Sequence, residues 1–216
     1  MAAAASGFEL DYSELREYGH AMFAEVAEAL GEDFAPYLAS CVEKAIATLE
    51  LDDGVVYDSD EEDAERGGAG DSDSEEDLDS DGEDAGGRRG ASNYSVFSGV
   101  VEEKAAACRA VSSYAHHCPA AFKGHIGEFL DKMGQMADHM HEIVRAQAHG
   151  ALARMAQCAL IAAPPPAQDA FPVVDAALNA AHRALAEDDD RDSASAAMES
   201  AAEVIKSVAA AAGGGI

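Results

Sequence analysis

Tryptophan is absent from this chain of 216 residues, proline occurs only six times, and aromatic residues make up 6% of the sequence. Alanine, the strongest helix former, occurs 49 times. This composition disfavours an all-β sandwich and favours helices. We therefore predict an all-α fold.

Basic residues are scarce: 14 Lys and Arg stand against 42 Asp and Glu, which gives a formal net charge of -28. A chain with this charge repels nucleic acid, which we exclude as a partner. Half of the net charge lies in residues 58–84, with 15 acidic residues and one basic residue. The other 189 residues hold 27 acidic and 13 basic residues, and their hydrophobic content is sufficient for a core.

Long apolar runs are also lacking. No stretch approaches the roughly 18 apolar residues that cross a bilayer, and the N-terminus has neither the basic nor the apolar region of a signal peptide. We expect a soluble, intracellular protein without membrane insertion. The four cysteines, Cys41, Cys108, Cys118 and Cys158, form no CxxC motif, so we predict reduced and mostly buried thiols.

Apolar side chains recur with a helical period of about 3.6 residues. The pattern predicts helices at 13–30, 34–49, 101–115, 122–133, 140–162, 168–187 and 192–211. Asp11 and Glu14 have the spacing of a capping box before the first helix, and Gly31 is a natural C-cap after it.

Three of these apolar stripes are predicted to face the core. They consist of Leu15, Tyr18, Met22, Phe23, Val26 and Leu30 in the first helix; Phe171, Val174, Leu178, Ala181 and Leu185 in the sixth; and Ala194, Ala197, Ala201, Ile205 and Val208 in the last.

Short connections predict that neighbouring helices form antiparallel pairs. We expect a flexible N-terminus (1–12), a helix pair (13–51), a disordered acidic insert (52–100), two further pairs plus one unpartnered helix (101–212), and a flexible C-terminus (213–216). The first helices of the units begin near residues 13, 101, 140 and 192, so two of the three spacings are 39 residues once the 49-residue insert is subtracted. Repeats of about this length predict a HEAT/armadillo-type α-solenoid.

Three segments carry a resemblance to a known family. ELREYGHAMFAEVAEALGEDFAPYL (14–38), VVEEKAAACRAVSSYAHHCPAAFKGHI (100–126) and HEIVRAQAHGAL (141–152) resemble the middle of importin-β superfamily nuclear transport receptors (karyopherins), most closely the importin-4 branch. In that family an acidic insert similarly follows a GEDFAPYL-like segment, and Val144-Arg145 looks like the recurrent Val-Arg of the second HEAT helix. The resemblance covers roughly residues 13–210.

The resemblance implies a segment of a HEAT-repeat superhelix that carries cargo through nuclear pores and releases it on binding Ran-GTP. It implies partners such as histones, ribosomal proteins and nuclear localisation signals (NLS), with Phe-Gly nucleoporins and Ran-GTP bound by the full-length receptor. It implies movement between the cytoplasm and the nucleus and no cofactor. The alternative, from a different functional class, is an acidic histone chaperone or HEAT-repeat scaffold without transport activity.

The acidic insert is the first candidate site, because clustered carboxylates attract segments rich in Lys and Arg. The alternative is a solvated spacer that only aids solubility. The candidate cargo-binding residues are Asp58, Asp60, Glu61, Glu62, Asp63, Glu65, Asp71, Asp73, Glu75, Glu76, Asp77, Asp79, Asp81, Glu83 and Asp84.

Four serines in the insert have an acidic residue three positions downstream, a pattern favoured by casein-kinase-2-type enzymes. They are Ser59, Ser72, Ser74 and Ser80. Phosphorylation of each would add nearly two negative charges. Coincidence in a tract rich in Asp and Ser is the alternative.

No motif of a catalytic or cofactor site is found in the sequence, so we expect no enzyme activity. A metal site is not predicted from His116, His117, Cys118, His125, His139 and His141, because their spacings do not converge. We interpret His116 and His117 as a polar helix end, where protonated imidazoles would meet the negative end of the helix dipole. Phe23, Phe34, Phe122, Phe129 and Phe171 are predicted to be core residues, although grooves between Ala-rich helices could bind Phe-Gly repeats.

Overall fold

Helices account for nearly all of the described chain. The computed structural model describes residues 6–8, 10, 12–53, 56–57, 94–95, 98–162 and 168–213. Its helices are α2 (Ser13–Leu30), η1 (Gly31–Phe34), α3 (Ala35–Leu49), α4 (Ser98–His117), α5 (Pro119–Phe122), η2 (Lys123–His125), α6 (Ile126–Ala137), α7 (Glu142–Ala162), η3 (Gln168–Ala170), α8 (Phe171–Glu187) and α9 (Arg191–Ala211). The predicted all-α class is confirmed for these residues.

One pair of very short strands lies outside the helical unit. β1 (Val56–Tyr57) and β2 (Tyr94–Ser95) pair antiparallel within a separate unit, Gly54–Phe97. The strand pair was not predicted from the sequence. Residues 58–93 lie outside the described ranges, so the predicted disorder of the acidic insert is not tested.

The helix ends follow from local sequence. Gly31 ends α2 with a φ of 56°, a backbone conformation that glycine adopts without steric strain. The residue that caps the start of α2 is Tyr12, which makes no side-chain capping bond, and Asp11 of the predicted capping box lies outside the described residues. At α9 a side-chain cap is present, because Asp190 Oδ1 accepts a hydrogen bond of 2.7 Å from the backbone N–H of Ser193.

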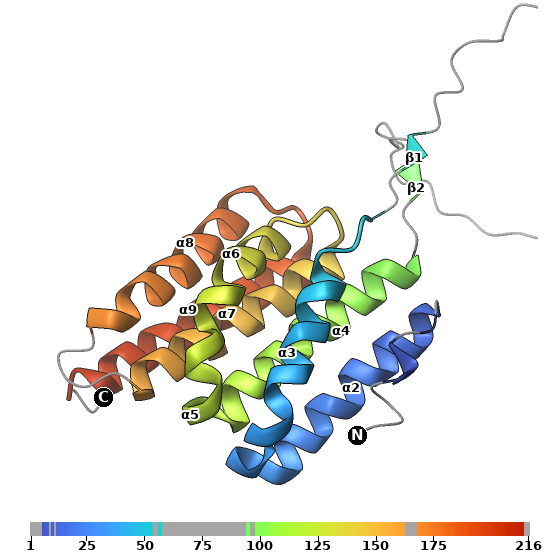
Figure 1. The fold of residues 1–216 in the computed structure, drawn as a ribbon. Helices are drawn as coiled ribbons and strands as arrows, with labels where there is room; N and C mark the ends of the chain where they lie inside the picture. The colour runs from blue at the N-terminus through green and yellow to red at the C-terminus, as the bar shows by residue number, and fades with distance from the viewer. Residues whose placement is uncertain are drawn as a thin grey trace, which may run out of the picture. The chain divides into compact units, whose positions relative to one another are not determined.

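Helices α2, α4, α7 and α9 pack side by side in one layer, and α3, α6 and α8 form a second layer on them (Figure 1). An ion pair joins the first two helices of the first layer: Arg16 donates two hydrogen bonds, of 2.7 and 3.0 Å, to the fully buried carboxylate of Glu103. Breaking such a pair would leave a buried charge without compensation.

The helices pair differently from the sequence prediction. The closest packing between the layers joins α3 with α4, α6 with α7 and α8 with α9, whereas α2 and α3 touch only slightly. The prediction that the last helix has no partner is therefore wrong, because α9 packs on both α7 and α8. Instead, α2 is the helix of the first layer that lacks a close second-layer partner among the described residues.

The core is built from alanines in the first layer and large side chains around them. Ala107, Ala110, Ala148, Ala151 and Ala156 are fully buried in α4 and α7. The largest fully buried side chains include Phe23, Phe34, Tyr114, Phe122, Phe129 and Met133. Four of the five phenylalanines predicted to be core residues are thus confirmed.

Phe171 is the exception, since 58% of it is exposed. The predicted core stripe of α8 is right for Ala181 but wrong for Phe171 and Leu185: the buried residues of this helix are Val173, Ala177, Ala180, Ala181 and Ala184. In α9 the prediction is right for Ala197, which is buried with Ser193, Ser200 and Val204, and wrong for Ile205 and Val208, which are exposed. Small side chains face the neighbouring helix because they permit close approach, and the larger ones point outward.

The predicted stripe of α2 is also displaced. Its buried residues are Gly19, His20, Phe23, Ala24 and Ala27, whereas Leu15, Tyr18 and Leu30 are exposed. A Cβ at position 19 would collide with the ring of Phe8, so Phe8 would have to shift if a larger residue replaced Gly19. Phe8 stacks on Phe23 with ring centroids 5.7 Å apart, although it belongs to the segment expected to be flexible.

Two phenylalanine substitutions test the buried faces. Phe122→Ala should lower the free energy of unfolding by about 3–5 kcal/mol, because it removes a fully buried ring and leaves a cavity. Phe171→Ala should change it by less than about 0.5 kcal/mol, because the ring is mostly in solvent. Urea unfolding followed by circular dichroism measures both values. An equal decrease in the free energy of unfolding for the two variants would indicate that Phe171 is a core residue, as the sequence predicted.

Candidate functional site

The acidic residues proposed from the sequence lie outside the described residues, as do Ser59, Ser72, Ser74 and Ser80. The structure therefore neither brings them together nor separates them. What it does show is the point at which the chain leaves the helical unit toward the insert, at Asp53.

The side chains of Lys104 and His139 both form hydrogen bonds with Asp53. Its Oδ1 accepts a hydrogen bond of 2.6 Å from Lys104 Nζ in α4 and one of 3.1 Å from His139 Nε2 between α6 and α7. The backbone N–H of His141 donates to His139 Nδ1 at 3.0 Å, so the ring proton of a neutral His139 is on Nε2. Burial opposes ionisation of Asp53, but the bonds from Lys104 and His139 hold the pKa of this carboxyl below its usual value.

A surface hollow of about 390 Å³ lies next to this point, between the end of α6 and the turn from α8 to α9. His139 belongs to its wall. The other lining residues are Ala137, Asp138, Arg145, Arg183, Ala184, Glu187, Asp188 and Asp189. We call this feature the acidic hollow, because its wall carries four carboxylates and two guanidinium groups.

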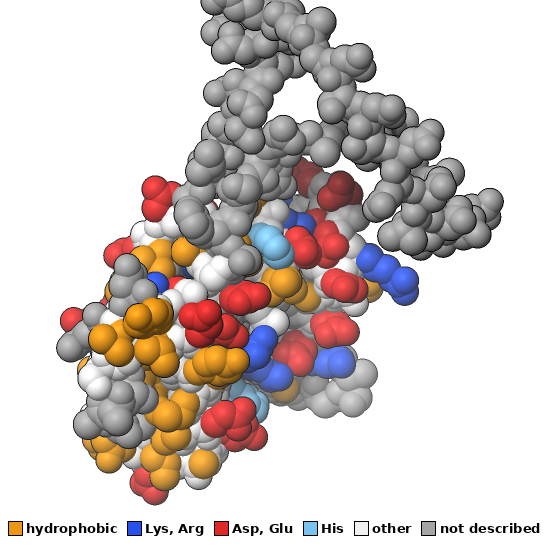
Figure 2. All heavy atoms as spheres, turned by 90° about the vertical axis from the view of Figure 1, so that its right-hand side faces the viewer, with side chains coloured by type: hydrophobic (Ala, Val, Ile, Leu, Met, Phe, Trp, Pro, Cys, Tyr) orange, Lys and Arg blue, Asp and Glu red, His pale blue; other side chains and the backbone are white. Residues whose placement is uncertain are grey.

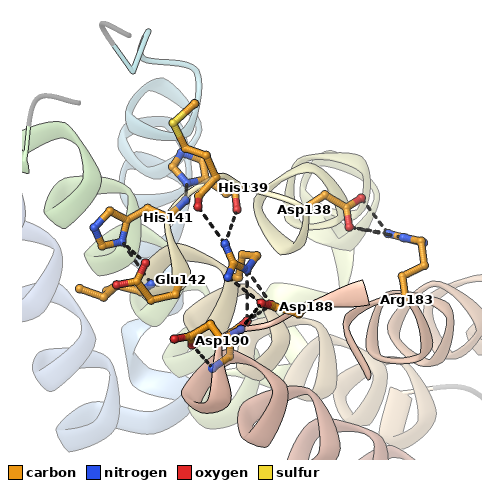
Figure 3. Close-up of polar contacts among 11 residues, drawn as sticks. Asp138, His139, His141, Glu142, Arg183, Asp188 and Asp190 are labelled. Atoms are coloured by element: carbon orange, nitrogen blue, oxygen red, sulfur yellow. Dashed lines mark hydrogen bonds and ion pairs between the residues drawn. The ribbon is translucent and has the colours of Figure 1, made fainter. Parts of the chain in front are cut away.

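The floor of the acidic hollow is organised by Arg145, which reaches across from α7 (Figure 3). Its Nε and Nη2 donate to the two carboxylate oxygens of Asp188 at 2.7 and 2.8 Å, the bidentate geometry that arginine favours. Its Nη1 donates to the carbonyl oxygens of His139 and Met140 at 3.0 and 2.9 Å. Arg145 thus ties the α6–α7 turn to the α8–α9 turn.

Asp188 is further stabilised in its ionised form. The hydroxyl of Ser193 donates to its Oδ2 at 2.6 Å, and the backbone N–H of Asp190 donates to its Oδ1 at 3.0 Å. Burial opposes ionisation, but these bonds and the Arg145 guanidinium lower the pKa of Asp188 to about 2.

A second pair at the rim joins Arg183 in α8 to Asp138 after α6, with Nη2 2.9 Å from Oδ2 (Figure 3). Both arginines of the acidic hollow are therefore engaged by aspartates. Glu187 and Asp189 are exposed and form no ion pair within the described part of the chain. The arrangement can attract a cationic side chain by its negative potential.

Cys118 and His125, two of the residues considered for a metal site, form hydrogen bonds or close polar contacts with other protein groups. Cys118 donates to the carbonyl oxygen of Gly31 at 3.1 Å, and His125 is 2.9 Å from Glu128. For His116, burial, followed by the positive charges of Arg154 and His117, lowers the pKa, which disfavours the protonated form expected at this helix end. Within the ranges that the structure covers, no three His, Cys, Asp or Glu residues form a group that could hold a metal.

All four thiols are buried, as predicted. Burial raises the pKa of Cys41, Cys118 and Cys158 to about 11 and that of Cys108 to about 12. At neutral pH they are protonated and therefore poor nucleophiles.

Two buried histidines were missed by the sequence analysis. His20 contacts Thr48 Oγ1 at 2.9 Å through Nε2, and burial, with a smaller effect of Lys44, lowers its pKa to about 3. His149 lies in α7 and is fully buried, with no hydrogen-bond partner for either ring nitrogen. Burial is the largest influence on its pKa, which is lowered.

Among the described helices, none has the combination of length and hydropathy needed to cross a membrane. A comparison of the sequence with models of protein families found no match, and a comparison with curated proteins found none either.

Replacing Asp188 tests the Arg145 anchor. Asp188→Asn should lower the free energy of unfolding by about 2 kcal/mol at pH 7, because the amide cannot accept the charged bidentate pair. Asp189→Asn, the exposed neighbour, should change it by less than about 0.5 kcal/mol.

The stability difference between the wild type and Asp188→Asn should depend on pH. A lowered pKa in the folded state means that Asp188 stabilises the fold above its unfolded-state pKa of about 4, and that this contribution disappears as the pH falls toward 2. Urea unfolding between pH 5 and about 2 should show the wild type and Asp188→Asn converging. A constant difference across this range would contradict the assignment.

His149→Leu should stabilise the protein, by about 1–3 kcal/mol at pH 7, because two buried ring nitrogens without partners are removed. The gain should increase as the pH falls below about 6.5, where the unfolded chain binds a proton that the folded state disfavours. His182→Leu, at an exposed position of α8, is the matched control and should show neither effect. Destabilisation by His149→Leu would indicate that this imidazole has a partner.

Proposed function

We propose that this chain is a segment of an importin-β-type nuclear transport receptor that binds basic, NLS-bearing proteins and accompanies them through the nuclear pore, between cytoplasm and nucleus. Its HEAT-type architecture is part of the proposal. Three successive helix pairs, α3–α4, α6–α7 and α8–α9, each place their second helix in the same layer, which is the arrangement expected of stacked HEAT repeats.

One observation supports the binding role above the others. The chain leaves the helical unit toward its most acidic segment at Asp53, and His139, which holds Asp53, also lines the acidic hollow. A partner rich in Lys and Arg would therefore meet negative potential both in the insert and on the helices where the insert begins. The proposal involves no chemical conversion of the partner.

Phosphorylation of Ser59, Ser72, Ser74 and Ser80 would strengthen this capture, because each phosphate adds nearly two negative charges to the insert. In this proposal, Phe-Gly nucleoporins and Ran-GTP bind to the full-length receptor.

Deleting residues 58–84 tests the proposal. Helical content and thermal unfolding should stay almost unchanged, because the helical unit has its own core in 12–53 and 98–213. Affinity for a fluorescent Lys/Arg-rich NLS peptide should fall at least about tenfold at low salt and less at high salt, because the interaction is screened. Fluorescence anisotropy at several salt concentrations measures this loss.

Two further variants define the mechanism of binding. A scrambled 58–84 segment of identical composition should bind as the wild type does, because attraction by clustered charge needs no fixed order. Glu187→Gln with Asp189→Asn should weaken binding about two- to fivefold if the acidic hollow contributes. Equal affinity with and without residues 58–84 would make the insert a spacer and remove its cargo role.

A pull-down separates transport from chaperone activity. Phe-Gly nucleoporin repeats should retain a transport receptor, whereas an acidic histone chaperone or scaffold would bind basic proteins alone. Retention of histones with no retention of Phe-Gly repeats by the full-length protein would favour the chaperone function.

A further inference from the structure

Helix α2 lacks the cover that the other helices of its layer have. Each of the other first-layer helices has a second-layer helix packed on it: α3 packs on α4, α6 on α7, and α8 on α9. Among the described residues no second-layer helix packs closely on α2, which contacts α4 along its length and α3 only slightly. Phe8 packs on the buried face of α2, at Gly19, His20 and Phe23, but within the described residues no helix packs closely on the side that carries Leu15 and Tyr18.

An apolar stripe runs along the uncovered side of α2. Leu15, Tyr18, Met22 and Val26 lie on one side of the helix by the helical period, adjacent to the buried face. Tyr18 is 67% exposed and Leu15 is 42% exposed, while Met22 and Val26 are partly covered. An exposed apolar row of this kind on a helix is typical of a surface that packs against another helix.

Four carboxylates follow the other edge of this stripe: Glu14, Glu17, Glu25 and Glu28. None of them forms an ion pair with a Lys or Arg in the part of the chain that the structure describes. Figure 2 views the molecule from the side on which α2 lies in Figure 1, and it shows hydrophobic side chains with both acidic and basic ones among them. The surface thus combines an apolar row with one flank of unpaired negative charge.

We infer that α2 docks an amphipathic helix of a partner protein, whose apolar stripe packs on Leu15, Tyr18, Met22 and Val26 and whose Lys or Arg residues face Glu14, Glu17, Glu25 and Glu28. This helix-on-helix mode uses the same packing that joins the helices inside the stack. A second copy of this chain is disfavoured as the occupant, because each copy carries a net charge of -28. The inference does not depend on the acidic insert.

Two designed helical peptides serve as probes. Both have the same row of leucines at positions i, i+3, i+4 and i+7, and one has lysines on its flanks where the other has glutamates. Fluorescence anisotropy with the full chain should show the lysine peptide binding at least about tenfold more tightly. Leu15→Ser with Tyr18→Ser should weaken that binding at least about tenfold, because both contacts are apolar.

Matched variants locate the binding on α2. Met198→Ser with Ile205→Ser removes equally exposed apolar groups from α9 and should change the affinity less than about twofold. Glu14→Gln with Glu25→Gln should reduce the preference for the lysine peptide without abolishing binding of either peptide. Deletion of residues 58–84 should leave the effect of the α2 substitutions intact.

Three results would overturn the inference. One is binding that is lost on deletion of 58–84 yet indifferent to the α2 substitutions, which would place the peptide on the insert. Another is equal affinity for the two peptides. The third is a wild-type dimer in sedimentation velocity that Leu15→Ser with Tyr18→Ser converts to a monomer, since the occupant would then be a second copy. Circular dichroism of each variant verifies that the helices remain folded.

Discussion

The close approach of alanine-rich helices is the constraint on which the rest of this structure depends. Ala107 and Ala110 in α4, together with Ala148, Ala151 and Ala156 in α7, are fully buried, so these helices can pack with little between them. Alanine contributes little apolar area, and the large buried rings and aliphatic chains must come from neighbouring positions. Phe122 in α5 and Phe129 in α6 are such buried rings, and they stack with centroids 5.8 Å apart. Among the described residues, α2 has no second-layer helix packed closely on it, and it shows an exposed apolar row.

The existence and approximate bounds of the helices could be predicted from the sequence, but their orientation and pairing could not. Helical periodicity, Gly31 and the prolines near helix starts mark where helices begin and end. Orientation was only partly right in α8 because the prediction gave weight to the largest residues, whereas Ala177, Ala180 and Ala184 are buried together with the predicted Ala181. Pairing failed because the helices were grouped in pairs from the first one onward, whereas the observed pairs also join consecutive helices but are shifted by one helix. In fact α3 pairs with α4, so the insert lies within a helix pair rather than between two.

The polar site was less predictable, because its contacts join residues that are distant in sequence. Arg145 and Asp188 are 43 positions apart, and Asp53 is 86 positions from His139. One local signal was present: Asp190, followed three residues later by Ser193, has the spacing of a helix cap. No signal marked His149, because an imidazole in a sequence is usually taken as polar, while its position in α7 turns it toward the core.

The distribution of ion pairs explains why so acidic a chain keeps an acidic surface. Three of the Lys and Arg residues that form ion pairs join helices of the fold: Arg16 pairs with Glu103, Lys104 with Asp53 and Arg145 with Asp188. Each of these pairs is partly or fully buried, where attraction is screened less by solvent and salt. Cations placed in this way are not free to neutralise surface carboxylates such as Glu25, Glu28, Glu187 and Asp189. These buried pairs thus use cations to stabilise the stack, and carboxylates such as Glu187 and Asp189 form no ion pair among the described residues.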